Sequence, residues 1–303
     1  DARIFALNSY ENRVYQAGVV DAPPLIVKFY RPGRWTDEQI LEEHRFTAEL
    51  AALEIPVVAP LQIQSPRSLY HFEGFRFAVF TRISGYAPEF DDPDKLLVMG
   101  RFLGRVHGVG KVHPFRYRRS LAIDWMGEDS REYLLRQGFI PDSLRPAYES
   151  LSADLLLKVR QRFAAVTGIR YFRIHGDCHV GNVLWQGEGP NFVDFDDTLS
   201  GPAVQDLWMM LSGSRDQQQG QLRELIEGYN EFADFNPAEL GLIEALRSLR
   251  IMHYSGWLAR RWGDPAFPRS FPWFNTERYW AAHILELREQ YAAMDEPPLQ
   301  LML

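Results

Sequence analysis

The hydrophobic pattern of the chain changes its period near residue 84, and this change limits the folds that are open to it. Before that point, short segments rich in β-branched and aromatic residues alternate with polar turns, which is typical of antiparallel strands. Beyond it, apolar residues recur every three or four positions, which is typical of helices. The sequence therefore predicts an α+β protein with a small antiparallel β part at residues 1–84 and a larger, mainly helical part at residues 85–303.

The first part is expected to form an antiparallel meander, one helix and a hairpin. The segments ARIFAL, RVYQAG and LIVKFY supply the meander, with polar turns between them. A helix is expected from about residue 37 to 53, with Thr36 or Asp37 as its cap. The segment LYHFEGFRFAVF predicts a hairpin that turns at Glu73 and Gly74.

The second part is expected to be helical, with one exception. Helical spacing begins in PDKLLVMGRFLGRVHGVG. Further helices are expected at about residues 129–137, 151–167, 203–212, 217–231, 237–262 and 276–293. The exception is VLWQGEGPNFVDF, which predicts a hairpin directly after the polar stretch HGDCHVGN. This polar stretch is the place to look for chemistry.

Composition and charge exclude several classes of function. The chain has 33 basic and 40 acidic residues, a formal net charge of −7, and no basic block typical of nucleic-acid binding. Its single cysteine excludes an internal disulfide and gives no sign of an oxidising compartment. No signal-peptide pattern and no apolar run of about 18 residues is evident. We expect a cytoplasmic protein that binds neither nucleic acid nor membranes; a monomer is favoured, with a dimer left open.

Three side chains in and after the polar stretch have the spacing of a phosphoryl-transfer site. Asp177 and Asn182 stand five positions apart, as do the kinase aspartate that accepts the hydroxyl proton and the asparagine that holds magnesium. Asp194 follows twelve residues beyond Asn182, at the end of the predicted hairpin, where its carboxylate can share the cation. Such hard oxygen ligands suit Mg²⁺ completed by water and ATP phosphates. We predict Asp177 and Asp194 as catalytic residues, with Asn182 and Asp194 as ligands of Mg²⁺ and ATP.

A lysine in an apolar strand indicates a phosphate contact. Lys28 lies in LIVKFY, where a charge is costly unless it meets an anion. In kinases such a lysine bridges the nucleotide phosphates and a glutamate of the next helix. Here that helix offers Glu42, Glu43 and Glu49, of which Glu43 is favoured and Glu42 is second. The turn between the first two strands is expected to close over the phosphates, with Ser9 as its candidate contact.

The motifs together resemble a known family. HGDCHVGN with VDFDD is similar to the aminoglycoside phosphotransferase and choline kinase branch of the protein-kinase-like fold. LNSYENRVYQ, VKFYRPGRWT, ILEEH, GPAVQDLWMML and RRWGDPAFPRSFPW are similar to the bacterial stress response kinase A family, and the resemblance covers essentially the whole chain. It implies a bilobal fold whose β lobe, residues 1–84, binds the nucleotide and whose helical lobe, residues 85–303, is catalytic.

The resemblance also implies an activity and its site. The activity is ATP- and Mg²⁺-dependent phosphorylation of serine or threonine in proteins, including the kinase itself, in a stress response. It implies Asp177 as catalytic acceptor, Asn182 and Asp194 as magnesium ligands and Ser9 as an ATP contact. Two departures from most protein kinases are the missing glycine-rich phosphate motif and the missing long activation segment ending in Ala-Pro-Glu after Asp194. Switching by loop phosphorylation is therefore not expected.

Other functions stay open on the residues alone. A small-molecule kinase acting on an aminoglycoside, choline, homoserine or a sugar would need the same loop, because the same chemistry serves any hydroxyl. A catalytically silent ATP-binding scaffold is a second alternative, against which the complete set of predicted site residues speaks. A zinc site at His175, Cys178 and His179 is disfavoured, because the glycines at 176 and 181 argue against a helix there.

Several nearby residues are expected to have structural roles. Asp196 and Asp197 either bind a second cation or cap the next segment, with the structural role favoured. Asp206 is expected to accept hydrogen bonds from the backbone of the polar stretch, which His175 braces, while Cys178 is a small buried side chain. Packing between helices is expected for most of a set of aromatic residues, namely Trp257, Trp262, Phe267, Phe271, Trp273 and Trp280.

Overall fold

The structure is a computed structural model that describes residues 3–7, 9–63, 66–90 and 92–301. Its contacts divide the chain into two compact units. The first unit is Asp1–Ser120, Arg170–Phe235 and Leu301–Leu303, and the second is Leu121–Ile169 and Asn236–Gln300. All the predicted site residues belong to the first unit. These units do not follow the predicted division at residue 84, which concerns the lobes and stays a prediction.

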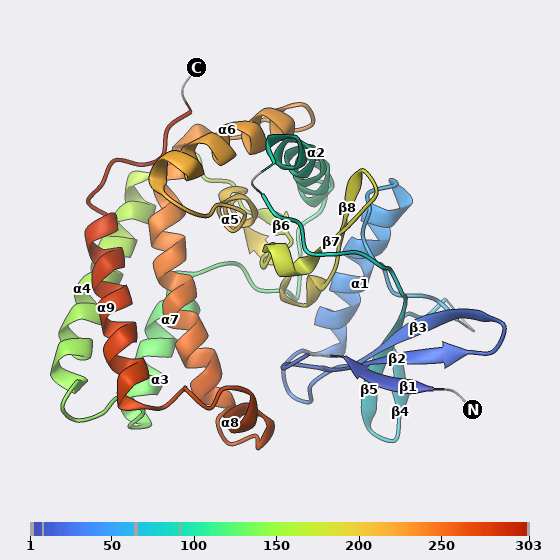
Figure 1. The fold of residues 1–303 in the computed structure, drawn as a ribbon, viewed down its shortest axis with the longest axis horizontal. Coiled ribbons are helices and arrows are strands. Elements are labelled where there is room, and N and C mark those ends of the chain that lie inside the picture. Colours follow the sequence, from blue (N-terminus) through green and yellow to red (C-terminus); the bar gives the residue numbers. More distant parts are fainter. Residues whose placement is uncertain (1–2, 8, 64–65, 91, 302–303) are drawn as a thin grey trace. The chain divides into compact units, whose positions relative to one another are not determined.

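The first 81 residues contain a five-stranded antiparallel sheet (Figure 1). Its strands are β1 (Ile4–Leu7), β2 (Arg13–Val19), β3 (Ala22–Phe29), β4 (Tyr70–Phe72) and β5 (Phe75–Thr81), in the spatial order β1-β2-β3-β5-β4. The expected meander and hairpin are confirmed. Glu73 and Gly74 both have positive φ, 47° and 81°, as the tight turn of a two-residue hairpin requires.

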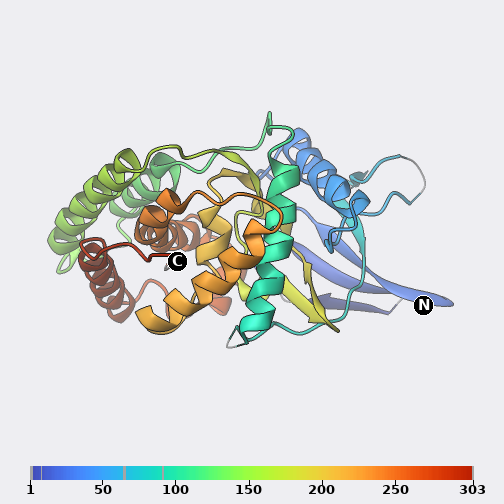
Figure 2. The same cartoon turned by 90° about the horizontal axis from the view of Figure 1, so that it is seen from above.

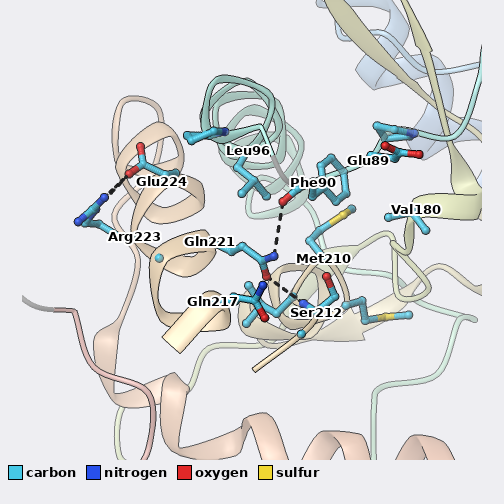
Figure 3. Close-up of a pocket in the computed structure, with 16 residues that line it drawn as sticks. Glu89, Phe90, Leu96, Val180, Met210, Ser212, Gln217, Gln221, Arg223 and Glu224 are labelled. Carbon is cyan, nitrogen blue, oxygen red and sulfur yellow. Dashed lines mark hydrogen bonds and ion pairs between the residues drawn. The ribbon is translucent and has the colours of Figure 1, made fainter. Parts of the chain in front are cut away.

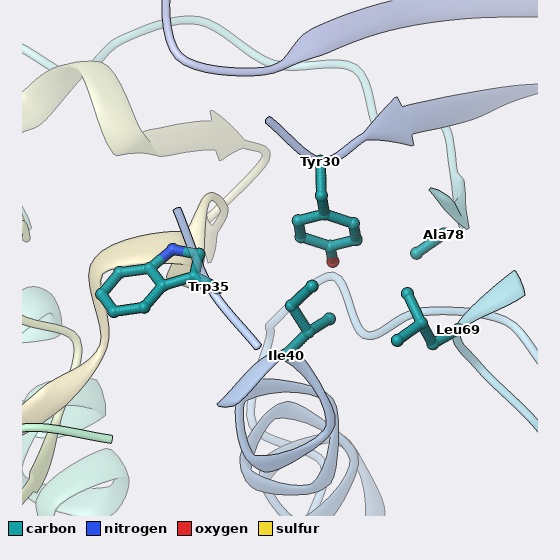
Figure 4. Close-up of a cluster of buried hydrophobic side chains, with 5 residues drawn as sticks. All are labelled: Tyr30, Trp35, Ile40, Leu69 and Ala78. Carbon is teal, nitrogen blue, oxygen red and sulfur yellow. The ribbon is translucent and has the colours of Figure 1, made fainter. Parts of the chain in front are cut away.

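Helix α1 (Asp37–Ala52) is capped by Thr36, whose side chain accepts a hydrogen bond from the Gln39 N–H in a capping box. Of the two predicted caps, Thr36 is therefore the one used. The helix packs on the sheet through a buried cluster, shown in Figure 4. The cluster contains Tyr30, Trp35, Ile40, Leu69 and Ala78. This packing holds α1 beside β3, the strand that carries Lys28.

The rest of the first unit surrounds the polar stretch. Its helices are α2 (Pro93–Gly110), α5 (Val204–Trp208) and α6 (Arg215–Asn230). Its short strands are β6 (Phe172–Ile174), β7 (Val183–Gln186), β8 (Gly189–Phe192) and β9 (Leu199–Gly201), paired as β6 with β9 and β7 with β8. Figures 1 and 2 show α2 and α6 side by side. The β7–β8 hairpin is confirmed, but α5 is shorter than the helix expected at 203–212, and the β6–β9 pair was not expected.

The second unit is helical. It contains a π-helical turn (Asp124–Glu128), α3 (Asp129–Arg136), α4 (Arg145–Ala165), a 3₁₀ segment (Pro237–Leu242), α7 (Ile243–Arg261), α8 (Ala266–Ser270) and α9 (Glu277–Ala293). Helix α4 begins six residues before the expected start, because Pro146 is tolerated in a first helical turn. The expected helix at 237–262 is divided, since Pro237 and Gly241 weaken an α-helix at its start.

The aromatic residues of the second unit pack against one another, as expected for most of them. The rings of Trp257 and Phe267 lie 5.1 Å apart in an edge-to-face arrangement, and Trp280 is fully buried. Trp273 also packs on other rings, with its ring centroid 5.2 Å from that of Tyr279, although 44% of its surface is exposed. Among the described residues, no helix combines the length and the apolar character needed to span a membrane.

Candidate active site

Lys28 lies at the centre of a buried ionic cluster. Its Nζ is 2.9 Å from Oδ1 of Asp196, 3.2 Å from Oδ1 of Asp194 and 3.8 Å from Oε1 of Glu43. Only 8% of the Lys28 side chain is exposed. Burial lowers the pKa of Lys28, but the attraction of Asp196, Glu43 and Asp194 outweighs it and raises this pKa well above its ordinary value. Lys28 therefore stays charged, which a phosphate contact requires.

The three candidate glutamates of α1 have three different partners. Glu43 faces Lys28, and burial raises the pKa of Glu43 to about 7. Glu49 pairs with Arg173 at 2.7 Å. Glu42 accepts three hydrogen bonds from consecutive backbone N–H groups, those of Arg116 (2.6 Å), Tyr117 (2.8 Å) and Arg118 (2.8 Å). The geometry thus places Glu43 at the lysine and excludes Glu42, the second choice from the sequence.

The polar stretch follows β6, and Asp206 holds its backbone by hydrogen bonds. This fully buried carboxylate accepts hydrogen bonds from the N–H groups of His175 and Gly176, both at 2.8 Å. The His175 ring in turn lies 2.9 Å from the backbone oxygen of Val193. Both expected supporting roles are confirmed. Gly176 has φ 85°, and a Cβ there would lie 2.5 Å from the Asp197 carbonyl, so this turn requires glycine.

Asp177, Asn182 and Asp194 are linked by short contacts. The Asn182 amide nitrogen donates to the Asp177 backbone oxygen at 2.9 Å and lies 3.4 Å from its carboxylate. The N–H of Val193, the residue before Asp194, donates to the Asn182 backbone oxygen at 3.0 Å. This hydrogen bond joins the segment that carries Asp194 to Asn182. Strand β8 ends at Phe192, so Asp194 follows the strand instead of ending it, with left-handed φ 58° and ψ 59°. Its side chain is 56% exposed, so it can reach a ligand.

The donor set fits a hard divalent cation. Because the amide nitrogen of Asn182 binds Asp177, its amide oxygen is the atom left for a metal. The Asp194 carboxylate supplies a second oxygen, and such ligands suit Mg²⁺. The zinc alternative fits less well, because His175 and His179 already bind backbone groups and Cys178 is fully buried. Burial also raises the pKa of the Cys178 thiol well above its usual value, which disfavours the thiolate that zinc needs.

Asp196 and Asp197 form ion pairs, and the expected capping role is wrong. Asp196 pairs with Lys28 and with Arg34, and the other guanidinium nitrogen of Arg34 lies 2.6 Å from Asp197. Burial alone would raise the pKa of Asp196, but Lys28, Arg34 and Arg118 lower it below its usual range. The cations attract these carboxylates more strongly than backbone N–H groups do. The next helix, α5, has Ala203 at its N-cap and no side-chain cap.

The turn between β1 and β2 contains Ser9, which is half-buried. Within the described part of the chain, no hydrogen bond joins Ser9 to the ionic cluster, and its contact with ATP stays a prediction. Asn12, three residues on, makes that connection instead. Its amide donates to Asp196 at 3.1 Å and its oxygen accepts from the N–H of Arg31 at 3.2 Å. Sequence reasoning missed Asn12, whose only signal was a polar residue in a turn.

Arg34 and Arg118 were also missed. Both reach the segment after Asp194 from distant parts of the chain; Arg118 is buried, and the Arg34 side chain is 12% exposed. The one signal in the sequence is the proximity of Arg34 to β3, in RPGRW. Nothing local to Arg118 indicates that it is buried.

A cavity of about 730 Å³ opens beside the polar stretch (Figure 3). It is lined by the start of α2 and the residues just before it, by residues 209–213 after α5, by residues of α6 between 217 and 224, and by Val180 of the polar stretch. Phe90, Leu96 and Met210 make its wall largely apolar. Charged side chains are few: Glu89, and Glu224, which pairs with Arg223 at 2.8 Å. Val180, three positions after Asp177, is the residue of the polar stretch that lines the cavity.

The comparisons with known proteins agree with this geometry. The model of the phosphotransferase enzyme family, APH, matches residues 3–243. The chain belongs to this family. Stress response kinase A of Escherichia coli strain K12 is 44% identical to this phosphotransferase over 301 residues, 99% of this chain and 90% of the relative. The serine/threonine protein kinase RdoA of Salmonella typhimurium strain LT2 matches with the same identity and coverage.

A solved structure confirms the fold. Amicoumacin kinase hAmiN, in complex with AMP-PNP, Ca²⁺ and Ami, superposes with a TM-score of 0.74 and 18% identity, over 98% of this chain and 89% of that one. The expected α+β, bilobal kinase-like fold and the family resemblance are confirmed, and the phosphotransferase is a kinase enzyme.

Proposed function

We propose that this kinase transfers the γ-phosphoryl group of ATP to serine or threonine hydroxyls of proteins, including its own, in a cytoplasmic stress response. The observation that carries the proposal is that Lys28 lies against Asp194, 166 positions further along the chain, while Asp194 follows the segment that is hydrogen-bonded to the Asp177–Asn182 pair. The names of the relatives at 44% identity support the protein acceptor and the stress response.

Each residue then has a defined role. Asp177 orients the attacking hydroxyl and accepts its proton, while Asn182 and Asp194 hold Mg²⁺, which neutralises phosphate charge when bound. Lys28 donates to the phosphates and is kept in place by Glu43. Ser9 closes the turn over them. Preorganised charge of this kind is the main contribution that a protein makes to phosphoryl transfer.

The cavity beside the polar stretch supports a polypeptide acceptor. A cationic small acceptor such as an aminoglycoside needs several unpaired carboxylates to bind its amines. The cavity is largely apolar, and Glu224 is already paired with Arg223. An apolar side chain of a polypeptide suits such a surface better, so the small-molecule alternative ranks second.

The experiment is incubation with γ-labelled ATP and Mg²⁺, alone and with casein, choline or kanamycin as acceptor. We expect label in protein only, and no transfer when EDTA removes the metal. Label in choline or kanamycin alone would reverse the ranking of the two acceptors. Nucleotide binding without any transfer would favour the silent scaffold.

A further inference from the structure

Arg118 is a buried arginine that contacts both α1 and the segment after Asp194. Its guanidinium is completely buried. Nε donates to the Gln39 backbone oxygen at 2.8 Å, and Nη2 donates to the Glu43 carboxylate at 3.0 Å. Nη1 donates to the backbone oxygens of Asp196 at 2.6 Å and Thr198 at 3.2 Å. One planar side chain therefore fixes two segments that carry site residues.

The backbone of Arg118 is fixed in return by α1. Glu42, 5% exposed, accepts the three consecutive N–H groups of residues 116–118. The face of Trp35 lies 4.3 Å from the Arg118 guanidinium. Because an unpaired buried charge costs several kcal/mol, arrangements of α1 that break these contacts are strongly disfavoured.

The other end of α1 is held by a second buried arginine. Arg173, which is 3% exposed, pairs with Glu49 and donates to the Val109 backbone oxygen at 2.9 Å. Arg173 belongs to β6, two residues before His175 of the polar stretch. Helix α1 is thus fastened at both ends to segments that lead into the site.

We propose that Arg118 is a positioning residue for phosphoryl transfer, which keeps Glu43 facing Lys28 and keeps the site assembled without phosphorylation of the chain. The inference rests on the proposed function. In protein kinases, phosphorylation of the activation segment and the position of the corresponding helix control this same lysine–glutamate pair. Here only twelve positions separate Asp194 from Asp206, which is too short for such a segment, and Arg118 supplies the missing constraint.

The test compares Arg118→Gln with Arg45→Gln, the same substitution at an exposed arginine of α1. We expect Arg118→Gln to raise the KM for ATP and to lower kcat/KM by about 10- to 100-fold. Arg118→Lys is expected to recover part of the loss, because it keeps the charge near Glu43 but not the forked geometry. A wild-type KM for ATP in folded Arg118→Gln, with only a lower Tm, would show a purely structural role and overturn the proposal.

A milder variant keeps the test decisive if Arg118→Gln does not fold. Glu42→Gln preserves the shape and one acceptor oxygen, and it is expected to raise the KM for ATP several-fold; an unchanged KM contradicts the proposal. Calorimetry with AMP-PNP and Mg²⁺ separates the two ideas. Wild-type protein that binds no nucleotide would refute the proposed function, whereas equal binding by the wild type and the Arg118 variant refutes only the positioning role.

The proposal that the site is assembled without phosphorylation of the chain is tested on the wild-type enzyme. After treatment with λ phosphatase and its removal, the initial rate is expected to stay within about twofold of that of untreated enzyme. A lag, or a loss of about tenfold or more that autophosphorylation restores, would show that phosphorylation assembles the site.

Discussion

At the scale of single residues, burial decides which carboxylate does what. Asp177 keeps 25% of its side chain exposed and Asp194 keeps 56%, so both can reach substrate and cation. Asp196 is buried between Lys28 and Arg34, and it therefore stabilises charge inside the protein. Neighbouring acids in one short stretch thus have different tasks because their surroundings differ.

Replacement of Asp177 tests its proposed role as the acceptor of the hydroxyl proton. We expect Asp177→Ala to lower kcat by about 10²- to 10⁴-fold, the usual contribution of a positioned general base. Nucleotide affinity should stay close to that of the wild type, because Asn182 and Asp194 remain. Initial rates and AMP-PNP calorimetry measure both quantities, with the exposed Asp154→Ala as control. Near-native turnover would remove Asp177 from the mechanism.

At the scale of elements, α1 combines a structural and a functional face. Its buried His44 lies 2.7 Å from the Tyr30 hydroxyl and 2.8 Å from the Ser68 hydroxyl. Burial, with the charges of Lys28 and Arg118, lowers the pKa of His44 to about 3. Below pH 6.5 the His44 imidazole is protonated in the unfolded chain but stays neutral in the folded protein until the pH approaches 3. The contribution of neutral His44 to the free energy of unfolding is therefore complete above pH 6.5 and is lost as the pH falls toward 3.

His44→Gln should therefore reduce the decrease in the free energy of unfolding that occurs as the pH falls below neutral. Between pH 7.5 and pH 5, the wild type should lose about 2 kcal/mol of unfolding free energy more than the variant. Glu43, whose pKa is raised to about 7, acts with the opposite sign between pH 4.5 and 7, but it is present in both proteins and cancels. Urea unfolding at each pH measures the difference. Parallel profiles would contradict the account of His44.

Helices α2 and α6 approach closely because α2 has glycine at the contact. A Cβ at Gly100 would lie 2.0 Å from the Leu225 backbone oxygen, whereas a Cβ at Gly108 of the same helix meets nothing within 4 Å. We expect Gly100→Ala to cost about 1–3 kcal/mol of stability and Gly108→Ala to be neutral or stabilising by up to about 1 kcal/mol. Chemical denaturation of both variants makes the comparison. Similar stability for the two would contradict the close packing.

The elements also show what local sequence can predict. Long periodic segments such as α1, α2 and α9 lie within a few residues of their expected bounds. Three-residue strands such as β6 and β9 were missed, because they have no period and form only by pairing with each other. At the site, the contact between Asp177 and Asn182 was predictable from a local spacing. Arg118 was not, because its partners lie about 75 to 80 positions away.

At the scale of the whole molecule, the residues proposed to bind the nucleotide and the cavity proposed for the acceptor are separate features of one unit. The residues proposed to bind the nucleotide lie on β3, on α1, in the polar stretch and at Asp194, whereas the cavity is lined by the start of α2, the segment after α5 and part of α6. Val180 is the element common to both regions. We therefore expect that acceptor binding can be changed without disturbing the binding of ATP.

Filling the cavity provides that test. Gly220 lines it, and a Cβ there meets nothing within 4 Å, so Gly220→Leu places an apolar side chain into open space. We expect the KM for a protein acceptor to rise several-fold while the KM for ATP stays constant, because only the acceptor uses this volume. Gly108→Leu, also open but away from the cavity, is the control. An unchanged acceptor KM would place the polypeptide elsewhere, and a raised KM for ATP would show that the two regions are not independent.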